Sequence, residues 1–318
     1  IQNSAQVLTQ APVETVMRDE LAHGDALLGT IAPILRHLLA NDDHSLFSDE
    51  IIARVRGMMV DLARQLLDAL NAAEELEPGT DHLADQRDNL VTAFVSHSGL
   101  LAHVHALALE WQLTERLSAR LGLDPVLSPL LQALIAAPEP ATAGTAMALL
   151  AAQARYAQNQ RRMQLPLAEL PGDLLHAAIA TMQAAAGERT DLAAAAEARI
   201  RADYDESRGR LGLIARLITG MGGGAMAALN VAHAGTAMFL SAMALASGQE
   251  RDLAVLSTNE GQLARLALAL RATGLKPEAI EEQFMSLHPE IALPDGFSGL
   301  GSDRAAALLA RSAVVVGG

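Results

Sequence analysis

The sequence predicts an all-α protein in which a long antiparallel helical hairpin precedes a helical-repeat-like region of the HEAT type. Of the 318 residues, 51% are hydrophobic but only 3% are aromatic. Ala and Leu, which are strong helix formers, dominate this apolar share, while the residues that favour strands are scarce. In addition, apolar residues recur at heptad spacing between residues 48 and 121, and Pro and Gly divide the later chain into shorter segments.

The chain before residue 48 is expected to be helical in pieces. Pro12 suits the first turn of a helix, whereas Gly24, Gly29 and Pro33 weaken a single continuous helix. The segment 41–45, which reads NDDHS, is expected to form a loop.

The first arm of the predicted hairpin spans residues 48–76. Ser48 can cap this helix, and Asp49 and Glu50 lie in its first turn, where acidic side chains favour the positive end of the helix dipole. Its apolar residues form two heptad rows, which are Ile52, Met59, Leu66 and Ala73, and Val55, Leu62, Ala69 and Leu76. Rows of this kind are typical of a packing seam between helices.

The second arm is expected to be one helix over residues 81–121, roughly 60 Å long at the standard rise per residue. Its main row contains Leu83, Leu90, His97, Val104 and Trp111. Because one hairpin cannot bury both faces of two such arms, we expect the N-terminal helices or a second copy to cover the rest. The sequence therefore predicts an acidic helical-bundle domain over residues 1–122 and a homodimer.

Shorter helices are expected in a second domain over residues 123–290. The segments 140–163, 171–187, 191–218, 225–247, 259–273 and 277–288 are bounded by Pro and Gly. Helix starts at Pro125, Pro171 and Pro277 give a weak repeat, with a spacing between the first two near that of HEAT-like units. Residues 291–318 are predicted to be a Gly/Pro-rich tail with at most a short helix.

No residue between Leu217 and Gln249 is charged. A membrane-spanning helix needs about 20 apolar residues. This run is interrupted by Gly220 and the glycines at 222–224, and it contains the polar Asn230 and His233. We therefore expect a buried helix pair, with peripheral membrane association through residues 217–249 as an alternative.

Residues 235–275 contain Phe239, a Ser247-Gly248 turn, a Glu260-Gly261 pair and the ending RATGL at 271–275. In these features the C-terminal half resembles a bacterial family known as domain of unknown function 2336. It implies a helical-repeat fold. It implies no catalytic residue, and the acidic N-terminal half departs from an all-repeat pattern.

Charge and composition exclude several functions. The net charge is −14, which disfavours a nucleic-acid partner because phosphate backbones need basic surfaces. The absence of Cys excludes disulfides and thiolate metal sites. No signal-like pattern opens the sequence, so a cytoplasmic protein is expected.

Few residues suggest chemistry. Glu20-x-x-His23 has the spacing of a di-iron ligand pair, but no second such motif accompanies it. Met221 and the glycines at 222–224 lack the strand and Lys of a phosphate-binding loop, and no Gly-x-Ser-x-Gly nucleophile motif occurs. We therefore predict no catalytic residue, no metal and no cofactor.

His97 is the one candidate phosphoacceptor. Its row-mates are apolar, which predicts a buried, neutral imidazole that makes a hydrogen bond across the bundle. Exposure of His97 would instead favour a histidine phosphotransfer module. The preferred prediction from the sequence is a non-enzymatic helical scaffold or regulatory adaptor for an unidentified protein partner.

Overall fold

The computed structural model describes residues 12–40, 49–74 and 80–312, and every regular element in these ranges is helical. This confirms the all-α prediction. The elements of the first half are α1 (Val13–Ala40), α2 (Asp49–Glu74), α3 (Thr80–Ser96), α4 (Ser98–Leu121), α5 (Pro129–Ile135), α6 (Pro140–Arg161) and the 3₁₀ turn η1 (Leu167–Glu169). Those of the second half are α7 (Gly172–Ala186), α8 (Thr190–Asp203), η2 (Glu206–Arg208), α9 (Arg210–Gly220), η3 (Gly222–Leu229), α10 (Val231–Ser247), α11 (Arg251–Leu256), η4 (Glu260–Gln262), α12 (Leu263–Ala272), α13 (Pro277–Leu287), η5 (Phe297–Gly299) and α14 (Ser302–Leu309).

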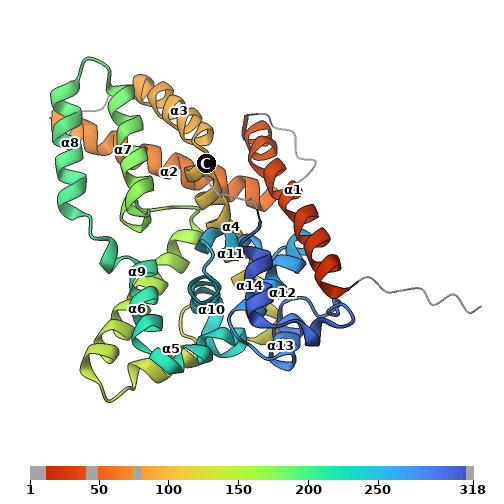
Figure 1. Ribbon diagram of the computed structural model, residues 1–318. Helices are drawn as coiled ribbons and strands as arrows, with labels where there is room; N and C mark the ends of the chain where they lie inside the picture. Colours follow the sequence, from red (N-terminus) through yellow and green to blue (C-terminus); the bar gives the residue numbers. More distant parts are fainter. Residues whose placement is uncertain (1–11, 41–48, 75–79, 313–318) are drawn as a thin grey trace, which may run out of the picture.

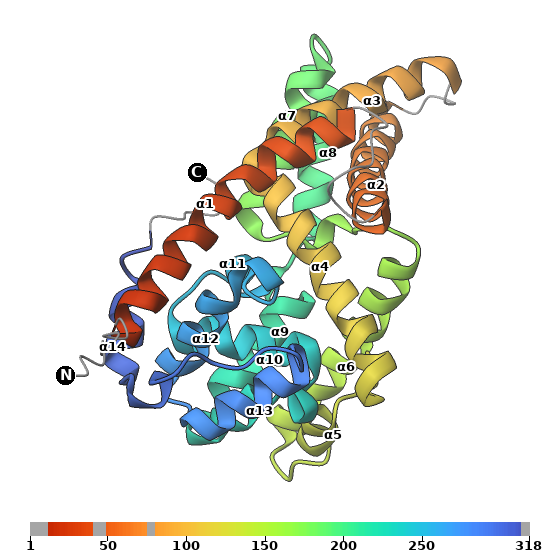
Figure 2. The ribbon, with the colours of Figure 1, turned by 90° about the vertical axis from the view of Figure 1, so that its right-hand side faces the viewer.

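Helix α4 runs through the middle of the fold (Figures 1 and 2). It packs against α2 and α3 from the predicted N-terminal domain and against α10 and α11 from the predicted C-terminal one. The buried apolar side chains accordingly form one continuous core, from Met17 on α1 to Leu309 on α14. The predicted boundary at residues 122 and 123 coincides with the end of α4, and the division into domains stays a prediction.

The predicted single helix over residues 81–121 is wrong. The chain bends by 91° between α3 and α4, and His97 stands at the corner with non-helical angles (φ −81°, ψ 107°). The His97 side chain accepts a hydrogen bond from the backbone N–H of Leu100, which caps the start of α4. The capping side chain and Gly99, a weak helix former, both lower the cost of a break at this point. Leu90 and Val104 therefore do not share one helical face with His97.

The large side chains of the α2 heptad rows are buried from Ile52 to Leu66, but by the chain itself, while the side chains of Ala73 and Leu76 lie outside the described residues. Ile52 is 3% exposed, and Val55, Met59, Leu62 and Leu66 are fully buried. Helices α3, α4 and α8 pack against α2 (Figure 1). The packing seam was predicted correctly, but its cover includes α8, which lies far along the sequence. The described part of these rows, Ile52 to Leu66, therefore offers no free surface for a second copy, and the homodimer stays a prediction that needs another surface.

Residues 13–40 form one helix rather than the predicted pieces. Helix α1 continues through Pro33 and lies along α12 at one end and α2 and α3 at the other (Figure 2). Gly24 lets it approach η4, just before α12, closely: Gln262 Nε2 donates to the Gly24 carbonyl at 2.6 Å, and a Cβ on Gly24 would lie 2.9 Å from Gln262 Oε1. Long-range packing here overrides local propensity.

Two other expectations need correction. The predicted helix over 191–218 ends at Asp203 and resumes at Arg210, because η2 intervenes. The predicted helix over 225–247 is divided into η3 and α10, which meet at Asn230 with a bend of 110°. In the tail, α14 packs against α12, and Phe297 and Leu300 are buried.

Candidate functional site

His97 is exposed, so the prediction that it is buried is wrong. Its Nδ1 accepts the Leu100 N–H at 3.1 Å. An acceptor at Nδ1 places the proton of the neutral imidazole on Nε2. The arrangement gives His97 a capping role that was not predicted from the sequence, where the available signal was that Ser98 and Gly99 are weak helix formers.

The buried histidines lie further along α4. His103 and His105 are each 2% exposed. His103 Nδ1 lies 2.8 Å from Asp252 Oδ2 on α11, so this pair joins α4 to α11. Burial lowers the pKa of His105 to about 4, which keeps its imidazole neutral at pH 7. The neutral, buried role predicted for His97 thus belongs to His105.

A buried charge cluster is the main polar feature of the core. We define it as Glu110 on α4, Arg210 on α9 and Arg251 on α11. Both Glu110 oxygens bind Arg210, at 2.7 Å for Oε1 to Nη1 and 3.1 Å for Oε2 to Nη2. Glu110 Oε1 also lies 2.9 Å from Nη2 of Arg251. Glu110 and Arg210 are 0% and 1% exposed, so these charges depend on one another rather than on water.

The short distances between Glu110 and the two Arg side chains determine the pKa of Glu110. Burial alone would raise the pKa of Glu110, but attraction to Arg210 and Arg251 lowers this pKa to about 2. The Arg210 guanidinium also lies 3.6 Å from the centre of the Tyr156 ring, which adds a cation–π contact. Arg251 Nε donates to Ser241 Oγ on α10 at 2.9 Å. The cluster therefore fixes α9, α10 and α11 against α4.

These fixed helices carry an exposed apolar groove, which we call the neutral groove. It encloses about 890 Å³, open mouth included, between the end of α9, η3 and the end of α10. It is lined by Ile218, Thr219, Gly222, Gly223, Ala225, Met226, Leu229, Ala242, Leu245 and Ala246. None of these residues is charged. Met226 and Leu245 are 46% and 53% exposed, so large apolar side chains reach solvent there.

The neutral groove partly overturns the prediction that residues 217–249 are buried. Most of α10 is buried, but Gly222–Gly224, Met226 and Ala227 are exposed. In the described ranges no single helix is both long and apolar enough to cross a bilayer, although two sharply bent helix pairs, one of them η3 with α10, have the length and composition together. The sequence analysis did not predict that part of this uncharged run is exposed. The glycines at 222–224, which interrupt the helix, were the available signal.

No metal centre is assembled in the described part of the chain. Within residues 12–40, 49–74 and 80–312, no group of three or more Asp, Glu or His side chains could hold a metal ion. His23 is exposed on α1 and does not join such a group.

Comparison with known proteins gives no identification. No protein-family model, curated protein or solved structure matches the chain. The resemblance to domain of unknown function 2336 and the HEAT-like repeat therefore stay predictions.

Proposed function

We propose that this protein is a non-enzymatic helical scaffold or regulatory adaptor that binds a protein partner through the neutral groove. The observation that carries the proposal is the combination of an uncharged apolar hollow and two large exposed side chains, Met226 and Leu245. Contiguous apolar surface on a folded chain is costly to leave in water and usually marks an interaction site.

The lining suggests the kind of partner. Ala and Gly make up half of the lining residues, and small side chains let another helix approach closely. A helix that inserts apolar side chains at i, i+3 or i+4 would bury Met226 and Leu245 without meeting a charge. Basic residues flanking such a helix would be attracted by the net charge of −14. A partner helix with an apolar face and basic flanks fits best.

A second copy of the chain is the other occupant that the groove could accept. Two copies that each carry −14 repel one another, and the neutral groove is a surface where they can meet without a like-charge pair. The predicted homodimer would therefore form through the neutral groove. The molecular mass of the bound species distinguishes a second copy from a different partner protein.

The first test replaces Leu245 with Asp. We expect Leu245→Asp to lower partner recovery from native lysate at least tenfold, because a carboxylate would be buried in an apolar contact. Met285→Asp is the matched control, since Met285 is 72% exposed on α13 and does not line the groove. Equal recovery of the same proteins by wild type and Leu245→Asp would contradict the proposal. Flotation of wild type, but not Leu245→Asp, with neutral liposomes would favour the membrane alternative.

Exposure of His97 favours phosphotransfer as a second candidate function. Attack on a phosphodonor needs a nitrogen lone pair, but that of Nδ1 is occupied by the Leu100 N–H. We therefore expect no more label at His97 than at the exposed His23 on incubation with acetyl phosphate. Acid-labile phosphate on wild type that His97→Ala abolishes, and His23→Ala keeps, would establish the phosphotransfer candidate.

A further inference from the structure

The sulfur of this protein is all in methionine, because the chain contains no Cys. Eleven Met are present, and all lie within the described residues. Three of them have strongly exposed side chains: Met147 on α6 at 52%, Met226 on η3 at 46% and Met285 on α13 at 72%. Of these three, Met226 lines the neutral groove. An oxidant in solution can therefore reach a thioether on the surface to which we assign partner binding.

The geometry of η3 places Met226 in the middle of one wall of the groove. A 3₁₀-helix has three residues per turn, so residues three positions apart share a face. Gly223, Met226 and Leu229 form such a row, and all three line the groove. Leu229 is 2% exposed and anchors one end of the row, whereas Gly223 at the other end is exposed. A Cβ on Gly223 would meet no atom within 4 Å, so the turn before Met226 leaves its side chain open to solvent.

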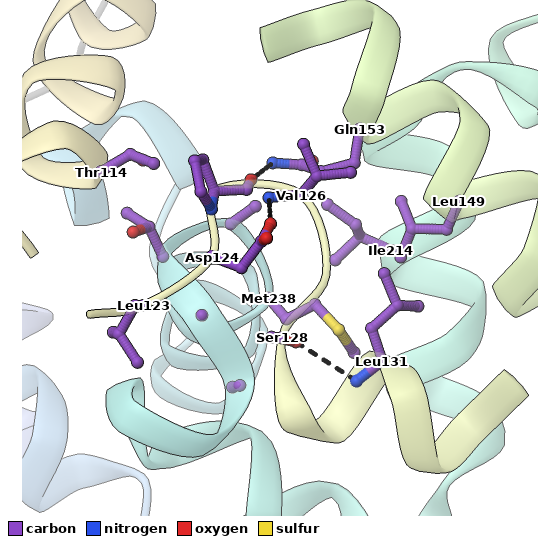
Figure 3. A pocket seen from close by; sticks show the side chains of 15 residues that line it. Thr114, Leu123, Asp124, Val126, Ser128, Leu131, Leu149, Gln153, Ile214 and Met238 are labelled. Carbon is purple, nitrogen blue, oxygen red and sulfur yellow. Dashed lines mark hydrogen bonds between the residues drawn. The ribbon is translucent and has the colours of Figure 1, made fainter. Parts of the chain in front are cut away.

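Met238 on α10 gives the matched contrast. It is 3% exposed, and with Leu131 it lines a small hollow beside the loop over residues 123–128 (Figure 3). This hollow has room for about one water molecule. The sequence predicted a helix start at Pro125, but α5 starts at Pro129, and the loop before it forms a wall of the hollow. A thioether in such a place is shielded from an oxidant in solution.

Oxidation of Met226 needs a peroxide and no other reactant. A lone pair of the sulfur attacks one oxygen of hydrogen peroxide, so an S–O bond forms and the O–O bond breaks. A proton passes to the departing oxygen, and the products are methionine sulfoxide and water. The sulfur loses two electrons, and the peroxide gains them. Because hydrogen peroxide is uncharged, the net charge of −14 does not repel it from the protein.

The sulfoxide places a polar group in the apolar lining. Its oxygen is a hydrogen-bond acceptor, and Thr219 carries the one side-chain hydroxyl among the ten lining residues. The other nine have no side-chain donor. Water satisfies the oxygen in the free protein, but an apolar side chain of a partner displaces that water and supplies no donor. Oxidation of Met226 therefore weakens partner binding.

We propose that Met226 is a redox-modification site, at which a peroxide converts the thioether to the sulfoxide and so releases the protein partner from the neutral groove. The inference rests on the proposed function, because it assigns regulation to the same surface. The modification is reversible, since enzymatic reduction of the sulfoxide restores the apolar side chain.

The test compares partner recovery from native lysate by the full chain before and after treatment with hydrogen peroxide, which catalase then removes. Mass spectrometry of peptides measures the sulfoxide at each methionine. We expect Met226 to oxidise about tenfold faster than Met238, and oxidised wild type to recover about tenfold less partner than untreated wild type. Met226→Leu keeps an apolar side chain of similar volume, so peroxide should leave its recovery unchanged. Met285→Leu is the matched control and should remain as sensitive to peroxide as wild type.

Two further arms separate oxidation of Met226 from general damage. Met226→Gln carries a permanent polar group and should lower partner recovery about tenfold without peroxide. Methionine sulfoxide reductases should restore the recovery by oxidised wild type.

The outcomes distinguish this inference from the proposed function. Equal recovery by oxidised and untreated wild type, or the same loss in oxidised Met226→Leu, would overturn the inference alone. Oxidation of Met226 no faster than that of Met238 would also overturn it. Recovery of the same proteins by untreated wild type and Leu245→Asp would instead overturn the proposed function.

Discussion

Glu110→Gln is expected to lower the free energy of unfolding by about 3–5 kcal/mol, the usual cost of breaking a buried ion pair from one side. The substitution keeps the shape of the side chain but removes the buried carboxylate that binds both Arg210 and Arg251. Urea denaturation at pH 7 measures the change. Glu14→Gln is the matched control, because the Glu14–Arg304 pair is 40% and 51% exposed and should contribute about 0–1 kcal/mol.

A triple variant separates the cost of unpaired charge from the contribution of the ion pairs. Replacing Glu110, Arg210 and Arg251 together by Met removes every charge of the cluster. We expect this variant to be more stable than Glu110→Gln, because apolar replacement of a whole buried ion cluster is often close to neutral. If the free energy of unfolding of Glu110→Gln instead lies within about 1 kcal/mol of the wild-type value, the cluster does not hold α9 and α11 against α4.

His105→Leu is expected to reduce the loss of stability in mild acid. The pKa of His105 is about 4 in the folded protein and about 6.5 in an unfolded chain. Between these values the unfolded state binds more protons, so stability is complete above pH 6.5 and falls as the pH drops through 4. The difference between the two pKa values corresponds to a loss of about 3 kcal/mol in the free energy of unfolding.

This pH window separates His105 from the charge cluster. Glu110 has a pKa of about 2, so its contribution to stability is lost only below about pH 4.5. Burial also lowers the pKa of His288, so His105→Leu should remove part of the loss rather than all of it. Urea denaturation at pH 7.0, 5.5 and 4.5 measures the slope, with the exposed His23→Leu as control. Parallel wild-type and His105→Leu curves would show that His105 does not bind its proton more weakly in the folded chain.

The fold class was predictable because it depends on local preferences. Ala-rich and Leu-rich segments favour helices wherever they pack, and the α2 heptad rows are buried from Ile52 to Leu66, as their pattern indicates. What covers those rows was not predictable. A row of apolar residues indicates that another helix covers it. The row does not indicate whether that helix is α8 of the same chain or a helix of a second copy.

The candidate sites were harder to predict because they depend on distant residues. Glu110 and Arg210 are 100 positions apart, and no local pattern pairs them. A single Glu within the apolar run ALALEWQL was the available signal that a buried charge needs a partner. At His97, heptad spacing suggested burial, but spacing has no meaning across a 91° bend.

Direct contact at the neutral groove tests the proposed function most directly. A photo-crosslinking amino acid placed at Leu245 should give one discrete adduct in cells that make the protein naturally. The same group at Met285 should give none. The mass of the adduct, read by mass spectrometry, identifies a partner protein or a second copy. No adduct at Leu245, or the same adducts at both positions, would contradict a docking role for the neutral groove.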